Sequence, residues 1–217
     1  MHITLTGKPY AGKGETSKVL EKFGFEVIHM GELYREVAKD RGLDVVELNR
    51  LGDTSVDAMV DKKLVEVAME RKNEDIVFDS RIAWHFFSSY KLGSYDVFLD
   101  VKEHIQAKRV MGAKRDSEKP VGSMEEAIKI ASERWDLEKT RYKKLYGIDN
   151  LNPKNYDIVV DTSSNTPTQN ALQILKGYYG GEENGVFEDG QAVFQKLCAR
   201  NAAEKRAYET KVEPKTF

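Results

Sequence analysis

Residues 7–13 have the types and the spacing of a loop that binds phosphate groups. Gly7 and Gly12 enclose four residues and are followed at once by Lys13, which matches the pattern Gly-x-x-x-x-Gly-Lys. Glycine lets the backbone curl so that its N–H groups point at phosphate oxygens, and the lysine supplies a mobile positive charge for the β and γ phosphates of a nucleotide. The alternative is an ordinary glycine-rich turn with a solvated lysine.

The residues that follow Lys13 differ from the usual form of this pattern. Gly14 stands where serine or threonine is usual, Glu15 adds a negative charge, and the first hydroxyl is that of Thr16. A hydroxyl near this position normally helps to hold Mg²⁺, so Thr16 is a candidate magnesium ligand. The residues of this segment that we expect to contact the nucleotide are Gly7, Tyr10, Ala11, Gly12, Lys13, Gly14, Glu15 and Thr16.

Further along the chain, a carboxylate and two arginines have the chemistry that phosphoryl transfer needs. Asp79 follows the apolar run 75–78, a position typical of a carboxylate that organises magnesium; capping of the next helix is its alternative role. Arg134 and Arg141 are seven residues apart, so they share one face of a helix. Their forked, permanent charges suit the three oxygens of a transferring phosphoryl group. The alternative is a solvated face joined by weak salt bridges through Glu138.

Apolar runs that alternate with helical patterns predict the elements that would position these residues. We expect strands over residues 2–6, 25–29, 75–78, 95–100 and 156–161. We expect helices over residues 13–23, 31–40, parts of 45–72, 102–111, 124–146 and 167–178. Strands that alternate with helices pair in parallel, because parallel strands need a crossover connection. The predicted fold is α/β: a doubly wound parallel sheet of about five strands with helices on both faces and ligands at the carboxyl ends of the strands.

Length and composition indicate one main domain. The chain has 217 residues, of which 40% are hydrophobic and 32% charged. We expect a domain over residues 1–181, then a linker and an amphipathic helical extension over residues 182–217. Residues 112–123 are polar and rich in Gly, Lys and Ser. We expect them to form a lid that closes over the nucleotide and excludes water, with a surface loop of no role as the alternative.

Charge and composition also limit the partners. The formal net charge of −2 does not favour binding to nucleic acid. No apolar run approaches the roughly 20 residues that span a bilayer, and a strand begins near the N-terminus, so we expect neither a membrane segment nor a signal peptide. The single cysteine, Cys198, cannot form a disulfide within the chain. We therefore expect a cytoplasmic protein, whose oligomeric state the sequence leaves open.

These segments together resemble the nucleoside monophosphate kinases, and among them the archaeal-type cytidylate kinases. The Gly-Lys-Gly of the loop is similar to that of adenylate and cytidylate kinases, in which a threonine usually follows. Residues 29–35, HMGELYR, resemble their monophosphate site, and residues 78–84, FDSRIAW, resemble a segment in which glycine usually stands at Ser80. Residues 134–149, RWDLEKTRYKKLYGID, resemble the helix after the lid. The resemblance covers roughly residues 1–178.

The resemblance implies a role for each matched residue. Gly31, Arg35 and Arg81 would bind the acceptor monophosphate. Lys13, Arg134 and Arg141 would surround the transferring phosphoryl group, with Asp79 as a magnesium ligand. The candidates from the lid are Arg109 and Arg115, which would contact the donor nucleotide.

The activity that the resemblance implies is ATP-dependent and Mg²⁺-dependent phosphorylation of a nucleoside monophosphate. The expected acceptor is CMP or dCMP. One alternative is a kinase for another acceptor such as dephospho-coenzyme A, because Gly-Lys-Gly-Glu and Met-Gly-Glu-Leu also resemble archaeal relatives of those kinases. The other is a nucleotide-binding regulator without catalysis, which Glu15 and Ser80 favour. In each case the expected partners are small-molecule nucleotides.

Overall fold

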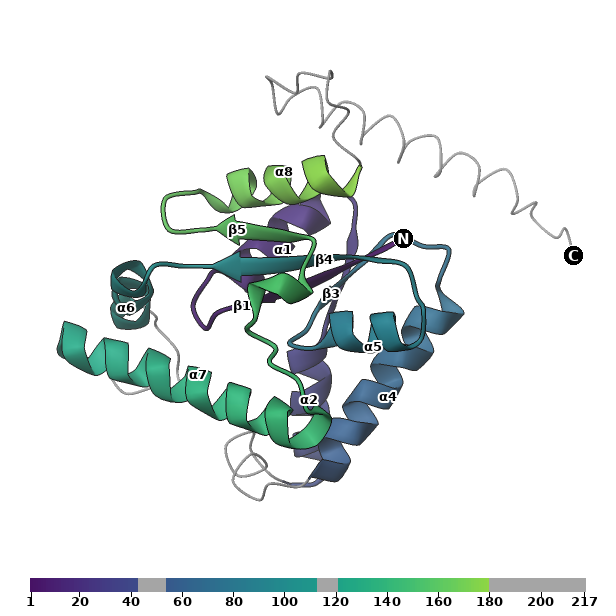
Figure 1. The fold of residues 1–217 in the computed structure, drawn as a ribbon, viewed down its shortest axis with the longest axis horizontal. Coiled ribbons are helices and arrows are strands. Elements are labelled where there is room, and N and C mark those ends of the chain that lie inside the picture. Colours follow the sequence, from purple (N-terminus) through teal and green to yellow (C-terminus); the bar gives the residue numbers. More distant parts are fainter. Residues whose placement is uncertain (43–53, 113–120, 180–217) are drawn as a thin grey trace, which may run out of the picture.

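The computed structural model describes residues 1–42, 54–112 and 121–179 (Figure 1). Arg115, most of the expected lid and the expected extension over residues 182–217 lie outside these ranges. Within them, no helix combines the length and the apolar character needed to cross a membrane.

Five strands form one parallel sheet (Figure 1). They are β1 (His2–Gly7), β2 (Glu26–His29), β3 (Ile76–Asp79), β4 (Ser94–Asp100) and β5 (Ile158–Asp161), in the order β2-β3-β1-β4-β5. The central strand β1 aligns Leu5 with Asp79 of β3 and Gly7 with Leu99 of β4. The carboxyl ends of these three strands therefore meet at one edge, where the glycine-rich loop begins.

Helices join the strands and cover both faces of the sheet (Figure 1). In the described ranges they are α1 (Lys13–Lys22), α2 (Met30–Asp40), α4 (Thr54–Glu70), α5 (Ala83–Ser89), α6 (Glu103–Gly112), α7 (Met124–Tyr146) and α8 (Pro167–Tyr178). A short 3₁₀ helix, Pro153–Asn155, precedes β5.

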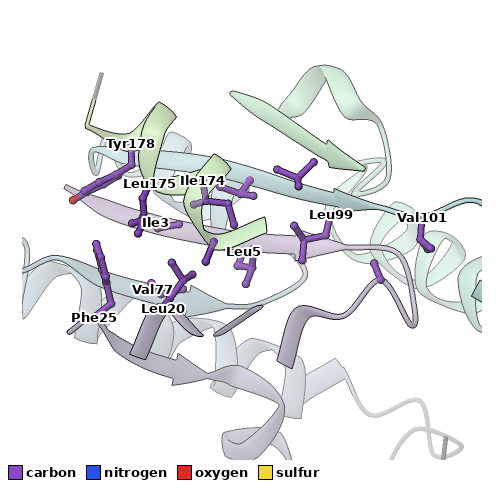
Figure 2. Packing of buried hydrophobic residues seen from close by; sticks show 14 residues of the cluster. Ile3, Leu5, Leu20, Phe25, Val77, Leu99, Val101, Ile174, Leu175 and Tyr178 are labelled. Atoms are coloured by element: carbon purple, nitrogen blue, oxygen red, sulfur yellow. The ribbon is translucent and has the colours of Figure 1, made fainter. Parts of the chain in front are cut away.

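Successive residues of β3 pack into two different hydrophobic cores, because strand side chains alternate between the faces of a sheet. Val77 packs with Leu20 of α1 and Ile174 of α8 in the core shown in Figure 2. Its neighbour Phe78 lies in the opposite core with Phe87 of α5. All of these side chains are fully buried, so the strand ends that carry Gly7 and Asp79 rest on a tightly packed base.

Helix α7 links two parts of the molecule. Its first half packs on α6 through the buried residues Ala107, Val110, Ala127 and Ala131. Its second half reaches α2 and α4 (Figure 1). There Arg141 contacts Tyr34 and Asp57. The helix begins at Ser123, whose side chain accepts a hydrogen bond from the backbone of Glu126, and ends at Gly147 in the left-handed conformation.

The fold predicted from the sequence is confirmed. Each expected strand is present, with ends that differ by at most two residues from those observed. The expected helices are present as well within the described ranges, and residues 45–53 of the expected 45–72 segment lie outside those ranges. Helix α5 was not expected, because its aromatic run Trp84–Phe87 has no clear helical spacing of polar and apolar residues.

Candidate active site

The loop between β1 and α1 has the conformation that its glycines predict. Gly12 lies in the left-handed region at a φ of 88°, and it gives the start of α1 no side-chain cap. The first N–H groups of a helix carry partial positive charge and need an acceptor. The start of α1 can therefore receive an anion, as the sequence pattern predicts.

Side chains from outside the loop hold its carbonyl groups. Gln106 of α6 donates to the carbonyl of Pro9 at 2.7 Å, and Arg109 donates to that of Tyr10 at 3.2 Å. Arg81 approaches the carbonyl of Gly7 at 3.4 Å. The backbone of the loop is thus fixed through its oxygens. These contacts leave the N–H groups at the start of α1 to a ligand.

Gly7 is required by a close approach between two strands. A Cβ atom on Gly7 would lie 2.6 Å from the carbonyl oxygen and 2.8 Å from the Cβ of Leu99. Since the first of these atoms belongs to the backbone of β4, no side-chain rotation can relieve the contact. Glycine here lets the loop leave the sheet directly beside β4.

Lys13 and Asp79 form an ion pair at the carboxyl ends of the strands. Asp79 also accepts from Nδ1 of His29 at 3.1 Å, so its two oxygens bind two different cationic or donor groups. Burial and the nearby Arg81 lower the pKa of Lys13 to about 8, against the opposing effect of Asp79. Burial alone would raise the pKa of Asp79, but Lys13, His29 and Arg81 outweigh it and hold that pKa well below its usual range.

Glu138 of α7 brings two of the predicted arginines together. Its carboxylate lies 3.1 Å from Nε of Arg81 and 3.6 Å from Nε of Arg134. Arg134 also lies over the ring of Tyr10 in the loop, with 5.7 Å between the guanidinium carbon and the ring centroid. Arg81 and Arg134 are thus placed beside the phosphate-binding loop.

Arg141 lies elsewhere, although it shares a helical face with Arg134. Its guanidinium forms an ion pair with Asp57 of α4 and donates to the hydroxyl of Tyr34 of α2 at 3.2 Å. Tyr34 follows the predicted acceptor-site residue Gly31 by three positions. The structure therefore places Arg141 on the side of α2 and α4, and Arg134 on the side of the loop.

The remaining predicted residues occupy different environments. Arg35 is 60% exposed and forms an ion pair with Glu32 on the same helix. Arg109, besides binding Tyr10, donates to the carbonyl of Thr162 at 2.6 Å, beyond the end of β5. Glu15 is exposed and pairs with Lys18. Gly14 is exposed at the start of α1, while Ala11 of the loop is buried.

Thr16 is fully buried, and its hydroxyl lies 3.5 Å from the amide nitrogen of Asn170 in α8. That position favours a packing role, and its role as a magnesium ligand stays a prediction. Asp79 fits a magnesium ion better, because it presents a largely buried carboxylate at the strand ends. In the described ranges no group of three His, Cys, Asp or Glu side chains could hold a metal. Mg²⁺ does not need such a group, since one carboxylate together with phosphates and waters can bind it.

Sequence reasoning missed a polar cluster between α4 and α7. In addition to the Asp57–Arg141 pair, the hydroxyl of Tyr146 donates to Asp61, one turn after Asp57. The only signal in the sequence is two aspartates four residues apart in one helix and charged or phenolic residues at similar spacing in another. Their contact joins residues more than 80 positions apart, which local patterns do not predict.

A parallel sheet in this order, with a glycine-rich loop leading from the central strand into a helix, defines the chain as a P-loop kinase in fold. An uncharacterized protein from Eubacterium ventriosum has a similar structure, with a TM-score of 0.62 and 16% identity over 83% of this chain and 99% of that chain. A shikimate kinase from Bacteroides thetaiotaomicron gives a TM-score of 0.55 and 16% identity over 82% and 98%. Identities this low show the fold alone.

Within that class, the chain belongs to the cytidylate kinase-like family, whose model matches residues 2–164. It is 36% identical over 181 residues to a cytidylate kinase of Methanosarcina mazei, which covers 81% of this chain and 94% of the relative. It is 31% identical over 176 residues to a cytidylate kinase of Thermoplasma volcanium, covering 81% and 90%. The resemblance noted from the sequence is thereby confirmed.

Proposed function

We propose that the protein transfers the γ-phosphoryl group of ATP to a nucleoside monophosphate and forms the diphosphate. The acceptor that we propose is CMP or dCMP. The observation that carries this proposal is the convergence of Lys13, Asp79 and Arg81 at the carboxyl ends of the neighbouring strands β1 and β3. The name cytidylate kinase borne by the relatives in M. mazei and T. volcanium supports CMP as the acceptor.

The loop side of this site suits the donor nucleotide. The uncapped start of α1 would receive phosphate oxygens, and Lys13 would exchange Asp79 for the β and γ phosphates. Arg134 lies over Tyr10 beside the loop and would neutralise charge on the transferring group. Arg109 joins the loop to the segment after β5 and would border the rest of the donor.

Asp79 is the residue that would hold Mg²⁺ in this proposal. When bound, the ion supplies positive charge that offsets the charge of the donor phosphates. His29 donates to one oxygen of Asp79 and so fixes the orientation of the carboxylate. Release of Lys13 toward the phosphates would leave the other oxygen to the ion.

The acceptor side is proposed to lie between Arg81 and helices α2, α4 and α7. Arg81 borders the loop, so it would bind the acceptor phosphate close to the γ phosphate. Arg35 of α2 is exposed and would turn toward the same phosphate. An acceptor phosphate is already an anion, so its oxygen attacks in line without a strong base, and the protein contributes position and charge.

A panel of acceptors tests this proposal. ADP release from ATP would be measured with CMP, dCMP, UMP, AMP and dephospho-coenzyme A, with and without Mg²⁺. We expect turnover with CMP or dCMP that requires Mg²⁺. Preferential turnover of dephospho-coenzyme A would replace the assigned acceptor, and no turnover with any of the five would favour a nucleotide-binding regulator.

A further inference from the structure

Two carboxylates and a guanidinium lie together between α4 and α7, on the acceptor side of the proposed site. Asp57 and Asp61 are four residues apart in α4 and project from one face of that helix. Arg141 binds Asp57 through Nε at 3.2 Å and also through Nη2. Tyr146 donates to Oδ2 of Asp61. We call these four residues the α4–α7 polar cluster.

The α4–α7 polar cluster is joined to the phosphate-binding end of the site. Burial raises the pKa of Tyr142, one turn after Glu138, and the charges of Glu138, Arg81, Arg141 and Asp61 also act on its hydroxyl. Glu138 itself pairs with Arg81. From Glu138 to Tyr142 the helix advances about 6 Å at 1.5 Å per residue. A nucleotide whose phosphate binds Arg81 would therefore extend its base toward Asp61.

Among the residues that the structure describes, one oxygen of Asp61 has no hydrogen-bond partner. Within the described ranges its hydrogen bond is the one from Tyr146 to Oδ2, which leaves Oδ1 as an acceptor. Burial raises the pKa of Asp61 to about 6, and Asp57 adds to this effect, while Tyr146 and Arg141 oppose it. Above that pH the carboxylate is ionised and can only accept hydrogen bonds. A partly desolvated carboxylate oxygen without a hydrogen-bond donor lowers stability, so binding a donor at Oδ1 is favourable.

The edge of a cytosine base matches this set of groups. Cytosine presents an amino donor at C4 and acceptors at N3 and O2, whereas uracil presents an oxygen acceptor at C4 and a donor at N3. A carboxylate beside a guanidinium is complementary to the first pattern and opposed to the second. The ring of Tyr146 packs against Phe86 at 5.4 Å between centroids, so the hydroxyl that orients Asp61 is held in place.

We propose that Asp61 determines base specificity by accepting a hydrogen bond from the amino group of cytosine, with Tyr146 as its positioning residue and Arg141 facing the N3 and O2 edge. This inference rests on the proposed kinase function and deepens it. A purely structural role, in which Tyr146 and Asp61 only tie α7 to α4, predicts a change in stability without a change in acceptor preference.

The test compares CMP with UMP as acceptors at pH 7.5, where Asp61 is ionised. The variants are Asp61→Asn, Tyr146→Phe and, as the matched control on the same helix, the exposed Glu70→Gln. An asparagine amide has nearly the shape of the carboxylate but can turn to donate to the C4 oxygen of uracil. We expect Asp61→Asn to lower the ratio of kcat/KM for CMP to that for UMP by at least about tenfold. Tyr146→Phe should lower it by roughly threefold, and Glu70→Gln should leave it unchanged.

The possible failures are distinct. If the wild-type protein turns over CMP in preference to UMP and Asp61→Asn keeps the same ratio, the inference is overturned and the kinase function stands. Equal turnover of CMP and UMP by the wild type would also overturn the inference and leave the kinase function standing. If Asp61→Asn does not fold by circular dichroism, Tyr146→Phe decides on the same ratio. If no acceptor is turned over, the kinase function fails, and binding is measured instead as the rise in melting temperature on adding CMP or UMP. A larger rise with CMP that Asp61→Asn removes would support the inference, and equal rises with the two nucleotides would overturn it.

Discussion

Lys13, the first residue of α1, forms an ion pair with Asp79, the last residue of β3. The pair connects the phosphate-binding loop to the strand next to it, and it buries both charges at the edge of the sheet where the loop begins. Each charge stabilises the other, so each substitution in the pair changes both the ligand site and the stability of the fold. The first two predictions follow from this arrangement.

Lys13→Ala should abolish turnover, because no other side chain at the start of α1 can offer a positive charge to the β and γ phosphates. We expect kcat to fall by about 100-fold or more, the scale of losing one main electrostatic contact in a transition state. Lys22→Ala, an exposed lysine at the end of the same helix, is the matched control. Steady-state ADP release measures both. Wild-type turnover by Lys13→Ala would show that the donor site is wrongly assigned.

Acid should destabilise the protein partly through Asp79. Its folded pKa lies below the unfolded value of about 3.9, so its contribution to stability is complete above that pH and is lost as the pH falls toward the folded pKa. In Asp79→Asn this loss is absent. We expect the free energy of unfolding of the variant to fall less steeply below about pH 4, by up to about 1.4 kcal/mol per pH unit.

Urea unfolding at several pH values between 3 and 7 measures these slopes. Asp96→Asn is an informative comparison, because burial raises the pKa of Asp96 and its contribution has the opposite sign. Removing Asp96 should therefore steepen the loss of stability toward acid. Parallel curves for wild type and Asp79→Asn would contradict the assigned charge state.

Gly7→Ala should destabilise the fold, because its methyl group would meet the backbone of β4 at 2.6 Å. Forcing an extra carbon into a packed region costs about 1–3 kcal/mol, equivalent to roughly 2–4 °C in melting temperature for each kcal/mol in a chain of this length. Gly14→Ala is the control, since nothing lies within 4 Å of its added Cβ and alanine favours a helix. Differential scanning calorimetry should give opposite signs for the two variants. A wild-type melting temperature for Gly7→Ala would mean that the backbone of β4 moves to accommodate the methyl group, which would contradict the prediction.

Arg141→Lys should affect acceptor binding more than the chemical step. Lysine keeps the charge but loses the fork that binds Asp57 through two nitrogens. We expect KM for CMP to rise by about tenfold while kcat changes by less than about threefold. Arg134→Lys, the same change beside the loop, should instead lower kcat. If Arg141→Lys lowers kcat and leaves KM unchanged, the role predicted from the sequence, at the transferring phosphoryl group, is correct.

The sequence predicted the sheet and the loop well because their signals are local. Each strand is a short apolar run, and the spacing of Gly7, Gly12 and Lys13 is a pattern within seven residues. The order of the strands was beyond reach, because hydrophobic patterns say that a strand is buried but not which strand lies beside it. Only the structure places β3 between β2 and β1.

The prediction of the site was limited because sequence spacing does not show which distant segments lie side by side. Helical spacing correctly put Arg134 and Arg141 on one face of α7, but the neighbours of that face change along its length. Spacing could not tell that Arg134 meets Tyr10 of the loop while Arg141 meets Asp57 of α4. The α4–α7 polar cluster depends wholly on such contacts between distant segments, and for that reason only coordinates reveal it.

The length of α7 has a consequence for how the two nucleotides influence one another. Arg134 and Arg141 are about 10 Å apart along one continuous helix, and each contacts a different part of the protein. A nucleotide that shifts α7 at the Arg134 end also shifts it at the Arg141 end, and the reverse holds as well. The affinities for ATP and for the monophosphate are then thermodynamically linked. The factor by which CMP strengthens the binding of ATP must equal the factor by which ATP strengthens the binding of CMP.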